Sequence, residues 1–393
     1  MARSVSSGDG LEVLQHFSEE GSAALDLVIE EFERQSDIAI ENTGTHISQL
    51  RLHVKNRILQ GNPPDVWVEW PGTNLEPTIE AGVVRDITPL WEESGMVDAY
   101  ADEAKQNARF DGHYRCVPID IYRINNVFYN IPLCERAGVD PTQPASPEEF
   151  LDVLARLDSA LDVPAFMLFG RDPFGACQFW EMLVAAHDGP RVYNALLDGN
   201  ARANRLTIQA ALETLDASLE YTPEETDFLT AEDADREFAE GQAAITINGM
   251  WSLGRIAATE GFEYGTDWGH VPMPGTDNCF ILNMNSLVPS ATSDADEIVT
   301  EFLRFAGSPD GLEIFDAEVG GIPPREDVSV SSFHPLIQEQ KRALERANTQ
   351  LSSATHGLGI SPAQLVSFKS AIASFMLDRD IEATTEALVD TFE

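Results

Sequence analysis

The first seventy residues alternate between two apolar patterns. Residues 11–17 and 65–69 form short apolar runs that predict buried strands, and 38–41 predicts another strand. Between them, apolar residues recur at helix spacing over 25–32 and again over 47–60. Strands and helices that alternate in this way favour a parallel sheet with helices on both faces. This part of the chain is therefore expected to be α/β.

A sharp transition from helix to strand is expected at 61–70. Gly61 stands at a position typical of a helix C-cap, and Pro63 and Pro64 prevent the helix from continuing. The strand that follows ends next to Trp70, a large aromatic residue at its carboxyl end. Open α/β sheets bind their ligands at this edge, so Trp70 marks a candidate binding face.

Two long extended stretches, 117–130 and 279–289, are expected to carry the chain between two lobes. Ser146, followed by Pro147 and Glu149, predicts a helix N-terminus with a capping box. The turn-rich segment 320–325 is a hinge candidate. The remaining patterns predict helices at 177–187, 205–220, 231–241, 294–306, 335–349, 361–377 and 380–392, and strands at 163–169 and 243–247.

A chain of 393 residues suits two domains, each able to bury its own core. We expect an N-terminal lobe formed by 11–120 and 286–327 and a C-terminal lobe formed by 121–285 and 328–393, with a ligand cleft between them. Residues 1–10 are polar and are expected to form a flexible leader or the remnant of a tether.

The charge is strongly acidic: 25 basic against 66 acidic residues give a net charge of −41, and only four of the basic residues are lysines. Nucleic acid and anionic membrane surfaces are therefore poor partners. The acids are spread through a chain that is 43% hydrophobic, which argues against disorder. Molar salt shortens the Debye length to ~3 Å and screens such charges. A salt-adapted surface is expected, with an ordinary acidic protein as the alternative.

Neither a membrane span nor a metal site is predicted. No window reaches the ~18 to 20 apolar residues that a span requires, and the first ten residues lack the apolar core of a signal peptide. The four cysteines, Cys116, Cys134, Cys177 and Cys279, have no metal-binding spacing. Buried free thiols are expected. If the protein is exported, Cys116 and Cys279 are candidates for a disulfide, although four cysteines allow three pairings.

Catalytic templates fit poorly, because the sequence contains no GxSxG elbow, P-loop, HExxH or GxGxxG motif after the first strand. No cofactor is expected. With so many acids, some carboxylate pair always has a suggestive spacing, so a secreted two-carboxylate glycosidase stays open as an alternative.

Aromatic, amide and imidazole residues instead gather at predicted strand ends and loop starts. A pyranose suits such a lining, since its C–H faces stack on rings while its hydroxyls pair with the planar polar groups of Asn, Gln, Arg and His. The candidates are His16, Phe17, Trp67, Trp70, Tyr122, Arg123, Phe174, Gln178, Trp251, Asn283, Asn285 and His356.

Several of these residues also have a structural interpretation. Phe17 and Trp67 alternate into an apolar strand and more often belong to a core, and Arg123 could pair with one of the many acids. His356 could be a solvated loop histidine. Trp251 follows a strand-to-helix turn, which is a ligand-facing position in α/β folds.

At these residues the chain resembles the extracellular sugar-binding proteins of ABC importers, within the family 1 solute-binding group and nearest to its glucose/galactose-type members. The resemblance extends over nearly all residues from Leu11 onward. Its motifs are weak singly and fairly specific in order: GNPPD (61–65), VPIDIYR (117–123), GQAAITINGMW (241–251), PMPGTD (272–277), GGIPPRED (320–327) and ATHG (354–357).

The resemblance implies a two-lobed, type II periplasmic-binding-protein-like fold, in which each lobe is a mainly parallel sheet flanked by helices. It also implies that the lobes close on a sugar by hinge bending. The family's contact positions correspond to Glu20, Trp70, Tyr122, Arg123, Phe174, Gln178, Trp251, Asn285 and His356. His16 lies in a segment where glucose-type members are rich in tryptophan.

The departures from the family pattern affect ligand identity. Trp70 and Tyr122 stand where histidine is usual, and Asn285 replaces an aspartate, which exchanges a charged acceptor for an amide donor.

The sequence thus predicts a non-catalytic receptor for a neutral mono- or oligosaccharide, most simply a glucose- or galactose-like hexose. We expect a monomer tethered outside the cell as a lipoprotein of a halophilic microbe, with ABC permease subunits as partners. A binding protein for a polyol, peptide or other compatible solute is a further alternative.

Overall fold

The computed structural model describes residues 10–17, 19–293 and 295–393, so all but the last residue of the predicted leader 1–10 lies outside the described residues. The chain forms two compact units. Unit 1 comprises the described residues of Met1–Ile121 together with Met284–Gln338, and unit 2 comprises Tyr122–Asn283 and Glu339–Glu393. The chain thus passes between the units three times. The third passage lies within a helix at 338/339, whereas the sequence division places it at 327/328.

Unit 1 is built on a five-stranded sheet in the order β2-β1-β3-β13-β6. Strand β1 pairs in parallel with β2 and β3, with Val13 opposite Val66 and Leu14 opposite Trp67. Strand β13 returns late in the sequence and pairs antiparallel with β3 and β6. The strands are β1 (Gly10–Gln15), β2 (Ala39–Gly44), β3 (Val66–Glu69), β6 (Val117–Pro118) and β13 (Ser286–Pro289), and β4 (Arg109–Phe110) pairs with β5 (His113–Tyr114).

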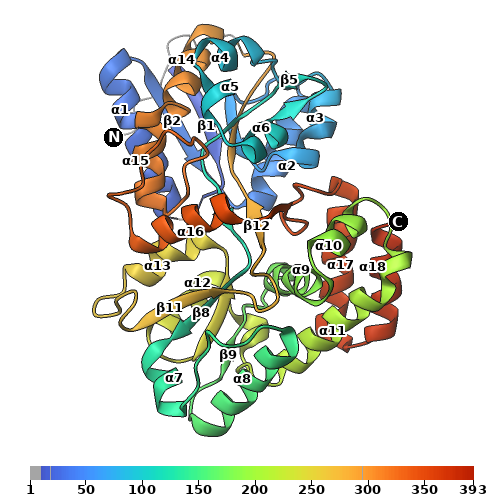
Figure 1. Cartoon of the computed structure of the whole chain (residues 1–393). Coiled ribbons are helices and arrows are strands. Elements are labelled where there is room, and N and C mark those ends of the chain that lie inside the picture. The colour runs from blue at the N-terminus through green and yellow to red at the C-terminus, as the bar shows by residue number, and fades with distance from the viewer. Residues whose placement is uncertain (1–9, 18, 294) are drawn as a thin grey trace. The chain divides into compact units, whose positions relative to one another are not determined.

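Helix α1 (Glu19–Ser36) packs on α15 (Pro309–Val319), as Figure 1 shows. Its apolar stripe is buried, and Phe32 contacts Phe302 and Phe305 at ring-centroid distances of 5.4 and 5.9 Å. The other helices of unit 1 are α2 (Ile47–Leu59), η1 (Gly72–Leu75), α3 (Glu76–Glu80), α4 (Thr88–Glu93), α5 (Met96–Ala99), α6 (Asp102–Ala108) and α14 (Asp296–Ala306).

Unit 2 contains a four-stranded sheet in the order β11-β8-β10-β9 and a three-stranded sheet in the order β14-β12-β7. Strand β8 pairs antiparallel with β10 and β11, while β9 and β10 are parallel. The strands are β7 (Tyr122–Arg123), β8 (Asn126–Asn130), β9 (Phe166–Met167), β10 (Ile245–Asn248), β11 (Trp268–Pro272), β12 (Cys279–Asn283) and β14 (Thr349–Ser352).

Helix α9 (Phe174–Asp188) runs through the core of unit 2, and every residue from Gly175 to Ala186 is buried. Trp180 on α9 contacts Phe368 and Phe392 at 5.2 and 5.9 Å between ring centroids. The other helices are α7 (Ile131–Ala137), α8 (Pro147–Ala160), α10 (Pro190–Leu197), η2 (Arg202–Asn204), α11 (Arg205–Leu219), η3 (Thr226–Phe228), α12 (Ala231–Ala239), η4 (Met250–Ser252), α13 (Leu253–Ala257), α17 (Pro362–Asp378) and α18 (Ile381–Thr391), with α16 (Pro335–Arg346) at the third passage.

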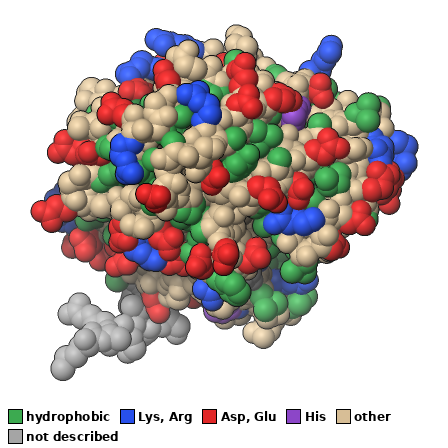
Figure 2. All heavy atoms as spheres, turned by 90° about the horizontal axis from the view of Figure 1, so that it is seen from below, with side chains coloured by type: hydrophobic (Ala, Val, Ile, Leu, Met, Phe, Trp, Pro, Cys, Tyr) green, Lys and Arg blue, Asp and Glu red, His purple; other side chains and the backbone are tan. Residues whose placement is uncertain are grey.

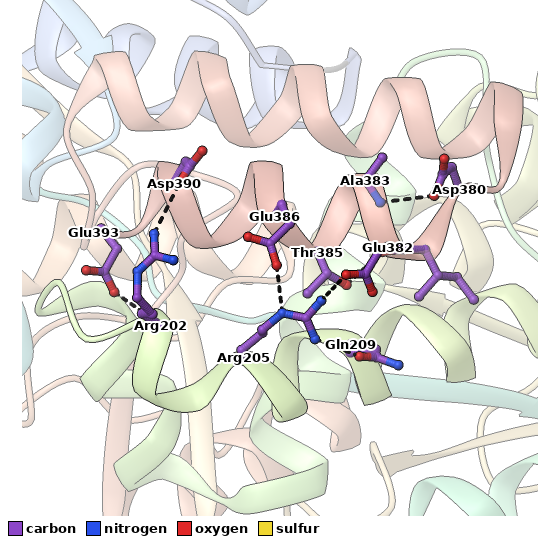
Figure 3. A network of polar contacts seen from close by, with 11 residues as sticks. Arg202, Arg205, Gln209, Asp380, Glu382, Ala383, Thr385, Glu386, Asp390 and Glu393 are labelled. Carbon is purple, nitrogen blue, oxygen red and sulfur yellow. Dashed lines mark hydrogen bonds and ion pairs between the residues drawn. The ribbon is translucent and has the colours of Figure 1, made fainter.

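Polar contacts fasten the C-terminal helix α18 to α11 (Figure 3). Arg205 at the start of α11 pairs with Glu382 at 2.6 Å and with Glu386 at 2.7 Å. The backbone N–H of Arg202 donates to Glu393 at 2.5 Å. These contacts are exposed, so each adds little stability, and the buried apolar residues of the two helices, such as Leu212 on α11 and Leu388 on α18, contribute more.

Acidic side chains are spread over the face seen in Figure 2, with few lysines and arginines among them. Within the described part of the chain, no helix combines the length and the apolar character needed to cross a membrane.

The two-lobed α/β fold predicted from sequence is confirmed. The sheets, however, are mixed, because the strands that follow the passages between units run antiparallel to their neighbours. The predicted strand at 117–130 is divided into β6, β7 and β8. Ser146 caps α8 by accepting from the Glu149 N–H, but Glu149 accepts from Ala145 and does not complete the capping box.

The hinge candidate 320–325 does not lie at a passage between the units. It belongs to unit 1, where Gly320 ends α15 in the left-handed conformation and Ile322 pairs with Ile121. A turn-rich composition is common to hinges and to ordinary helix ends, so it could not distinguish them.

Phe392→Ala is expected to lower the free energy of unfolding by about 3 kcal/mol, because it removes a buried ring from the contact with Trp180 and Phe368. Denaturant unfolding measures the change. Leu377→Ala is the control, since Leu377 is 88% exposed; equal losses in the two variants would contradict this account of the core.

Candidate functional site

Four rings come together in unit 2: Tyr122, Phe174, Trp251 and His356, here called the ring cluster. Trp251 lies 5.8 Å from Tyr122, 6.4 Å from Phe174 and 5.3 Å from His356, between ring centroids. Phe174 and His356 are 5.0 Å apart, edge to face. Trp251 and Phe174 are half-buried, whereas Tyr122 and His356 are buried. Segments far apart in the sequence therefore build one aromatic surface.

Trp251 is positioned by the turn that follows β10. A Cβ on Gly249 would lie 2.1 Å from the Trp251 ring, so only glycine allows the indole to fold back over this turn. Asn248, at the end of β10, donates to Asp235, which also pairs with Arg255 at 2.5 Å. Burial raises the pKa of Asp235, and Arg255 opposes that rise. The indole thus rests on a turn fixed by a buried ion pair.

Helix α9 supplies Phe174 and Gln178, one turn apart on the same side. Gln178 is fully buried, and its Nε2 donates to the Ile124 carbonyl at 3.3 Å. Its Oε1 is buried and has no hydrogen-bond partner among the described residues. A buried acceptor of this kind is costly unless a ligand or water satisfies it.

Glu181, the next polar residue of α9, holds the loop that carries His356. Its carboxylate accepts hydrogen bonds from Ser353 Oγ at 2.8 Å, from the Ala354 N–H at 2.8 Å and from the Thr355 N–H at 3.2 Å. Ser353 Oγ also lies 2.7 Å from His356 Nδ1. His356 is therefore a buried, hydrogen-bonded residue and not a solvated loop histidine.

Lys369 of α17 also approaches the ring cluster, with its Nζ 5.3 Å from the centroid of Phe174. Sequence reasoning missed Lys369, Glu181 and Ser353. A helix pattern identifies the buried face of α9 but does not indicate which loop that face will support.

Arg123 is buried, but it is held by neutral groups rather than by an acid. Its guanidinium donates to Asn125 Oδ1 at 3.1 Å and to the Cys279 carbonyl at 3.2 Å, and it stacks 5.0 Å from Phe280. Desolvation lowers the pKa of Arg123 to about 10, which still leaves it charged at neutral pH. The structural alternative considered from sequence, pairing with a carboxylate, does not occur among the contacts described.

Unit 1 contains a second group of rings, His16, Phe17 and Trp70. His16 lies 5.5 Å from Phe17 and 5.7 Å from Trp70 between centroids. Arg51 lies 4.8 Å above the Trp70 ring and pairs with Glu69 at 2.7 Å.

His16 is neutral at physiological pH, because burial lowers its pKa to about 4. Its Nε2 is buried without a hydrogen-bond partner among the described residues. Glu20, in the first turn of α1, is half-buried. Trp67, by contrast, is 2% exposed in β3, so its structural interpretation is correct.

Asn285 is joined to a buried carboxylate in unit 1. Asp120 accepts from the Asn285 backbone N–H at 2.6 Å and from its Nδ2 at 2.7 Å. Asn285 Oδ1 is buried without a protein partner among the described residues. The contact with Asp120 explains why residue 285 is an asparagine, because an aspartate there would place a second carboxylate against Asp120. Asn283, at the end of β12, is buried opposite Tyr122.

All four cysteines are buried free thiols. The Cys116–Cys279 disulfide considered from sequence is absent, and these two residues belong to different units. Burial raises the pKa of Cys116 to about 12, so this thiol is unreactive. No group of histidine, cysteine and acidic side chains suited to a metal ion occurs among the residues described.

Asn285→Asp is expected to destabilise the protein by about 2 kcal/mol at pH 7, because it replaces a donor beside Asp120 with a second negative charge. In the variant, repulsion between Asp120 and the new aspartate would raise the pKa of one of the two carboxyl groups in the folded state. The deficit is therefore expected to grow as the pH rises from 4 to 7 and to shrink as it falls. Denaturant unfolding at both pH values tests this; a deficit independent of pH would contradict it, and Asn285→Ser is the uncharged control.

The comparisons identify the chain at the level of family. Residues 28–341 match the model of the bacterial extracellular solute-binding proteins. A xylose/arabinose-binding protein of Haloferax volcanii, XacG, is 28% identical over 387 residues, which cover 96% of this chain and 83% of that protein. An uncharacterised extracellular-binding protein of an ABC transporter from Pyrococcus horikoshii is 26% identical over 341 residues, covering 86% and 76% of the two chains.

Solved structures share the fold along nearly the whole chain. The solute receptor AcbH, described as having an exclusive preference for β-D-galactopyranose, superposes with a TM-score of 0.86 at 16% identity and covers 98% of both chains. Maltose-bound MalE3 of T. maritima has a TM-score of 0.78 at 18% identity, again over 98% of both chains. The chain belongs to the bacterial extracellular solute-binding protein family, whose members are receptors and not enzymes.

Proposed function

We propose that this protein is the substrate-binding component of an ABC importer and captures a neutral mono- or oligosaccharide, most simply a hexose such as glucose or galactose. The observation that carries the proposal is the ring cluster of unit 2 with buried polar atoms beside it. Stacked aromatic rings favour the apolar face of a pyranose, and buried donors and acceptors favour its hydroxyls.

Three buried polar atoms support a ligand rich in hydroxyl groups. Gln178 Oε1, His16 Nε2 and Asn285 Oδ1 lack hydrogen-bond partners among the described residues. Gln178 and Asn285 present acceptors, which a sugar hydroxyl satisfies by donating. The neutral His16 offers either a donor or an acceptor, as its tautomer dictates. A hydrocarbon ligand beside any of these atoms would leave that atom unsatisfied.

The names of similar proteins point to sugars of several kinds. XacG is named a xylose/arabinose-binding protein, AcbH is described as preferring β-D-galactopyranose, and another solved structure, RafE, is a complex with raffinose. These names support a sugar ligand and make a pentose the main competitor of a hexose.

The rest of the proposal concerns mechanism and location. Capture would involve hinge bending at the three passages of the chain between the units. The loaded monomer would then dock on permease subunits outside the cell, held there by a lipid anchor. The charge of −41 suits a salt-adapted surface.

Trp251→Ala is expected to weaken sugar binding roughly tenfold to a hundredfold, because it removes the apolar ring surface that the sugar would cover, a loss of about 1.5–3 kcal/mol. Thermal shifts in molar KCl with glucose, galactose, xylose, arabinose, maltose and raffinose identify the ligand, because a compound that binds only the folded state raises the melting temperature. Calorimetry then gives the affinity of each variant.

Phe228→Ala is the matched control, since Phe228 is an aromatic residue of the same unit that is 77% exposed. It should bind like the unmodified protein. Equal affinities of the two variants would remove Trp251 from the site, and a panel without any shift would contradict the sugar proposal.

A further inference from the structure

The buried carboxylate of Glu181 faces hydrogen-bond donors on both oxygens. Oε2 accepts from the N–H groups of Ala354 and Thr355 and lies 3.0 Å from the Tyr193 hydroxyl. Oε1 lies 2.8 Å from Ser353 Oγ. Glu181 itself is 0% exposed. The two backbone N–H groups can only donate, so their partner, the Glu181 carboxyl group, must accept hydrogen bonds from them.

Burial raises the pKa of Glu181, and the hydrogen bonds from Ser353, Thr355 and Tyr193 offset only part of that rise. A carboxylate satisfies all of these donors. A protonated acid with its hydrogen on Oε2 would donate to the Tyr193 hydroxyl, which can donate in turn to the Ser352 carbonyl at 3.0 Å, and Oε1 would still accept from Ser353. Converging backbone N–H groups favour the ionised form.

The proton of Ser353 is therefore directed to Glu181. A serine hydroxyl has one hydrogen to donate and two lone pairs with which to accept. Ser353 Oγ also lies 2.7 Å from His356 Nδ1 and 3.4 Å from the His356 backbone N–H. Once its hydrogen is given to Glu181, the hydroxyl oxygen can only accept from both of these atoms. His356 Nδ1 must then carry a hydrogen.

We propose that Glu181 and Ser353 are positioning residues that fix His356 as the Nδ1–H tautomer, so that its Nε2 presents an acceptor to a ligand hydroxyl at the ring cluster. This inference rests on the proposed function only in its last step, the contact with a sugar. The tautomer follows from the relay of hydrogen bonds alone. A histidine held in this tautomer selects a ligand group that donates a hydrogen bond to Nε2.

Hydrogen bonds that run in the opposite direction would give the other tautomer of His356. If Glu181 were protonated and donated to Ser353, then Ser353 would donate to His356 Nδ1, and Nε2 would carry the hydrogen. The ¹⁵N chemical shifts of the two ring nitrogens distinguish these tautomers in the full, sugar-free chain at pH 7. We expect Nδ1 to be protonated and Nε2 not; the opposite pattern, or an equal mixture, overturns the proposal.

Glu181→Gln is expected to reverse the tautomer. The glutamine Oε1 would keep the two backbone N–H groups, and its NH2 would donate to Ser353 Oγ, which turns the serine hydrogen toward His356 Nδ1. We expect an Nε2–H histidine and a roughly tenfold loss of affinity for whichever of glucose, galactose, xylose or arabinose the unmodified chain binds. An unchanged tautomer in a folded variant would contradict the relay.

Ser353→Ala provides a second variant, and Ser218→Ala is its control. Ser218 is equally buried in unit 2, and its hydroxyl donates to the Thr214 carbonyl of its own helix at 2.8 Å. Loss of the fixed tautomer in Ser353→Ala, with no change in Ser218→Ala, supports the relay; the same spectrum in all three proteins overturns it.

The two claims fail in different ways. A protein that binds none of the six sugars in the thermal-shift panel contradicts the proposed function and leaves the tautomer measurement intact. A protein that binds one of them with His356 in the Nε2–H form contradicts this inference alone.

Discussion

The burial of α9 is the constraint on which the arrangement of unit 2 depends. Because every residue from Gly175 to Ala186 is buried, each polar side chain among them must find a partner inside the protein. Gln178 bonds the Ile124 carbonyl, and Glu181 bonds the 353–355 backbone. These contacts attach the segment after β7 and the loop of His356 to one helix. The same helix begins with Phe174, so one ring of the cluster and the group that supports His356 share one rigid element.

Buried polar pairs also shape the second ring group, in unit 1. Glu69 holds Arg51 over Trp70 and accepts from the Trp70 N–H, which fixes both the indole and the cation above it. Asp120 fixes Asn285 through two hydrogen bonds. In each unit, a carboxylate that the sequence pattern did not single out orients a neutral or aromatic side chain. This arrangement suits recognition of an uncharged ligand.

The alternating patterns before residue 70 predicted β1, α1, β2, α2 and β3. Local pattern and burial agree in β1, α1 and β3, whereas β2 is an edge strand without a buried residue. The short helices between β3 and β6, and the strand β14, were missed. They have too few residues to show a period, and β14 is defined by pairing with β12, far away in sequence.

Residues of the candidate site could be predicted where an aromatic or imidazole ring lies at the end of a predicted strand or helix. Phe174, Trp251 and His356 were named from such positions, and the structure brings them together with Tyr122. The supports Glu181, Ser353 and Lys369 gave no such signal, because a glutamate among 66 acidic residues carries no information about its burial. Arg123 shows the same limit: the sequence indicated a charge but not the carbonyl and amide that hold it.

A crystal structure of the protein bound to the sugar that gives the largest thermal shift tests the central claim most directly. The account predicts the sugar ring against Trp251 and a ligand hydroxyl within hydrogen-bond distance of His356 Nε2. A sugar bound elsewhere, with Trp251 and His356 free of contact, would contradict it.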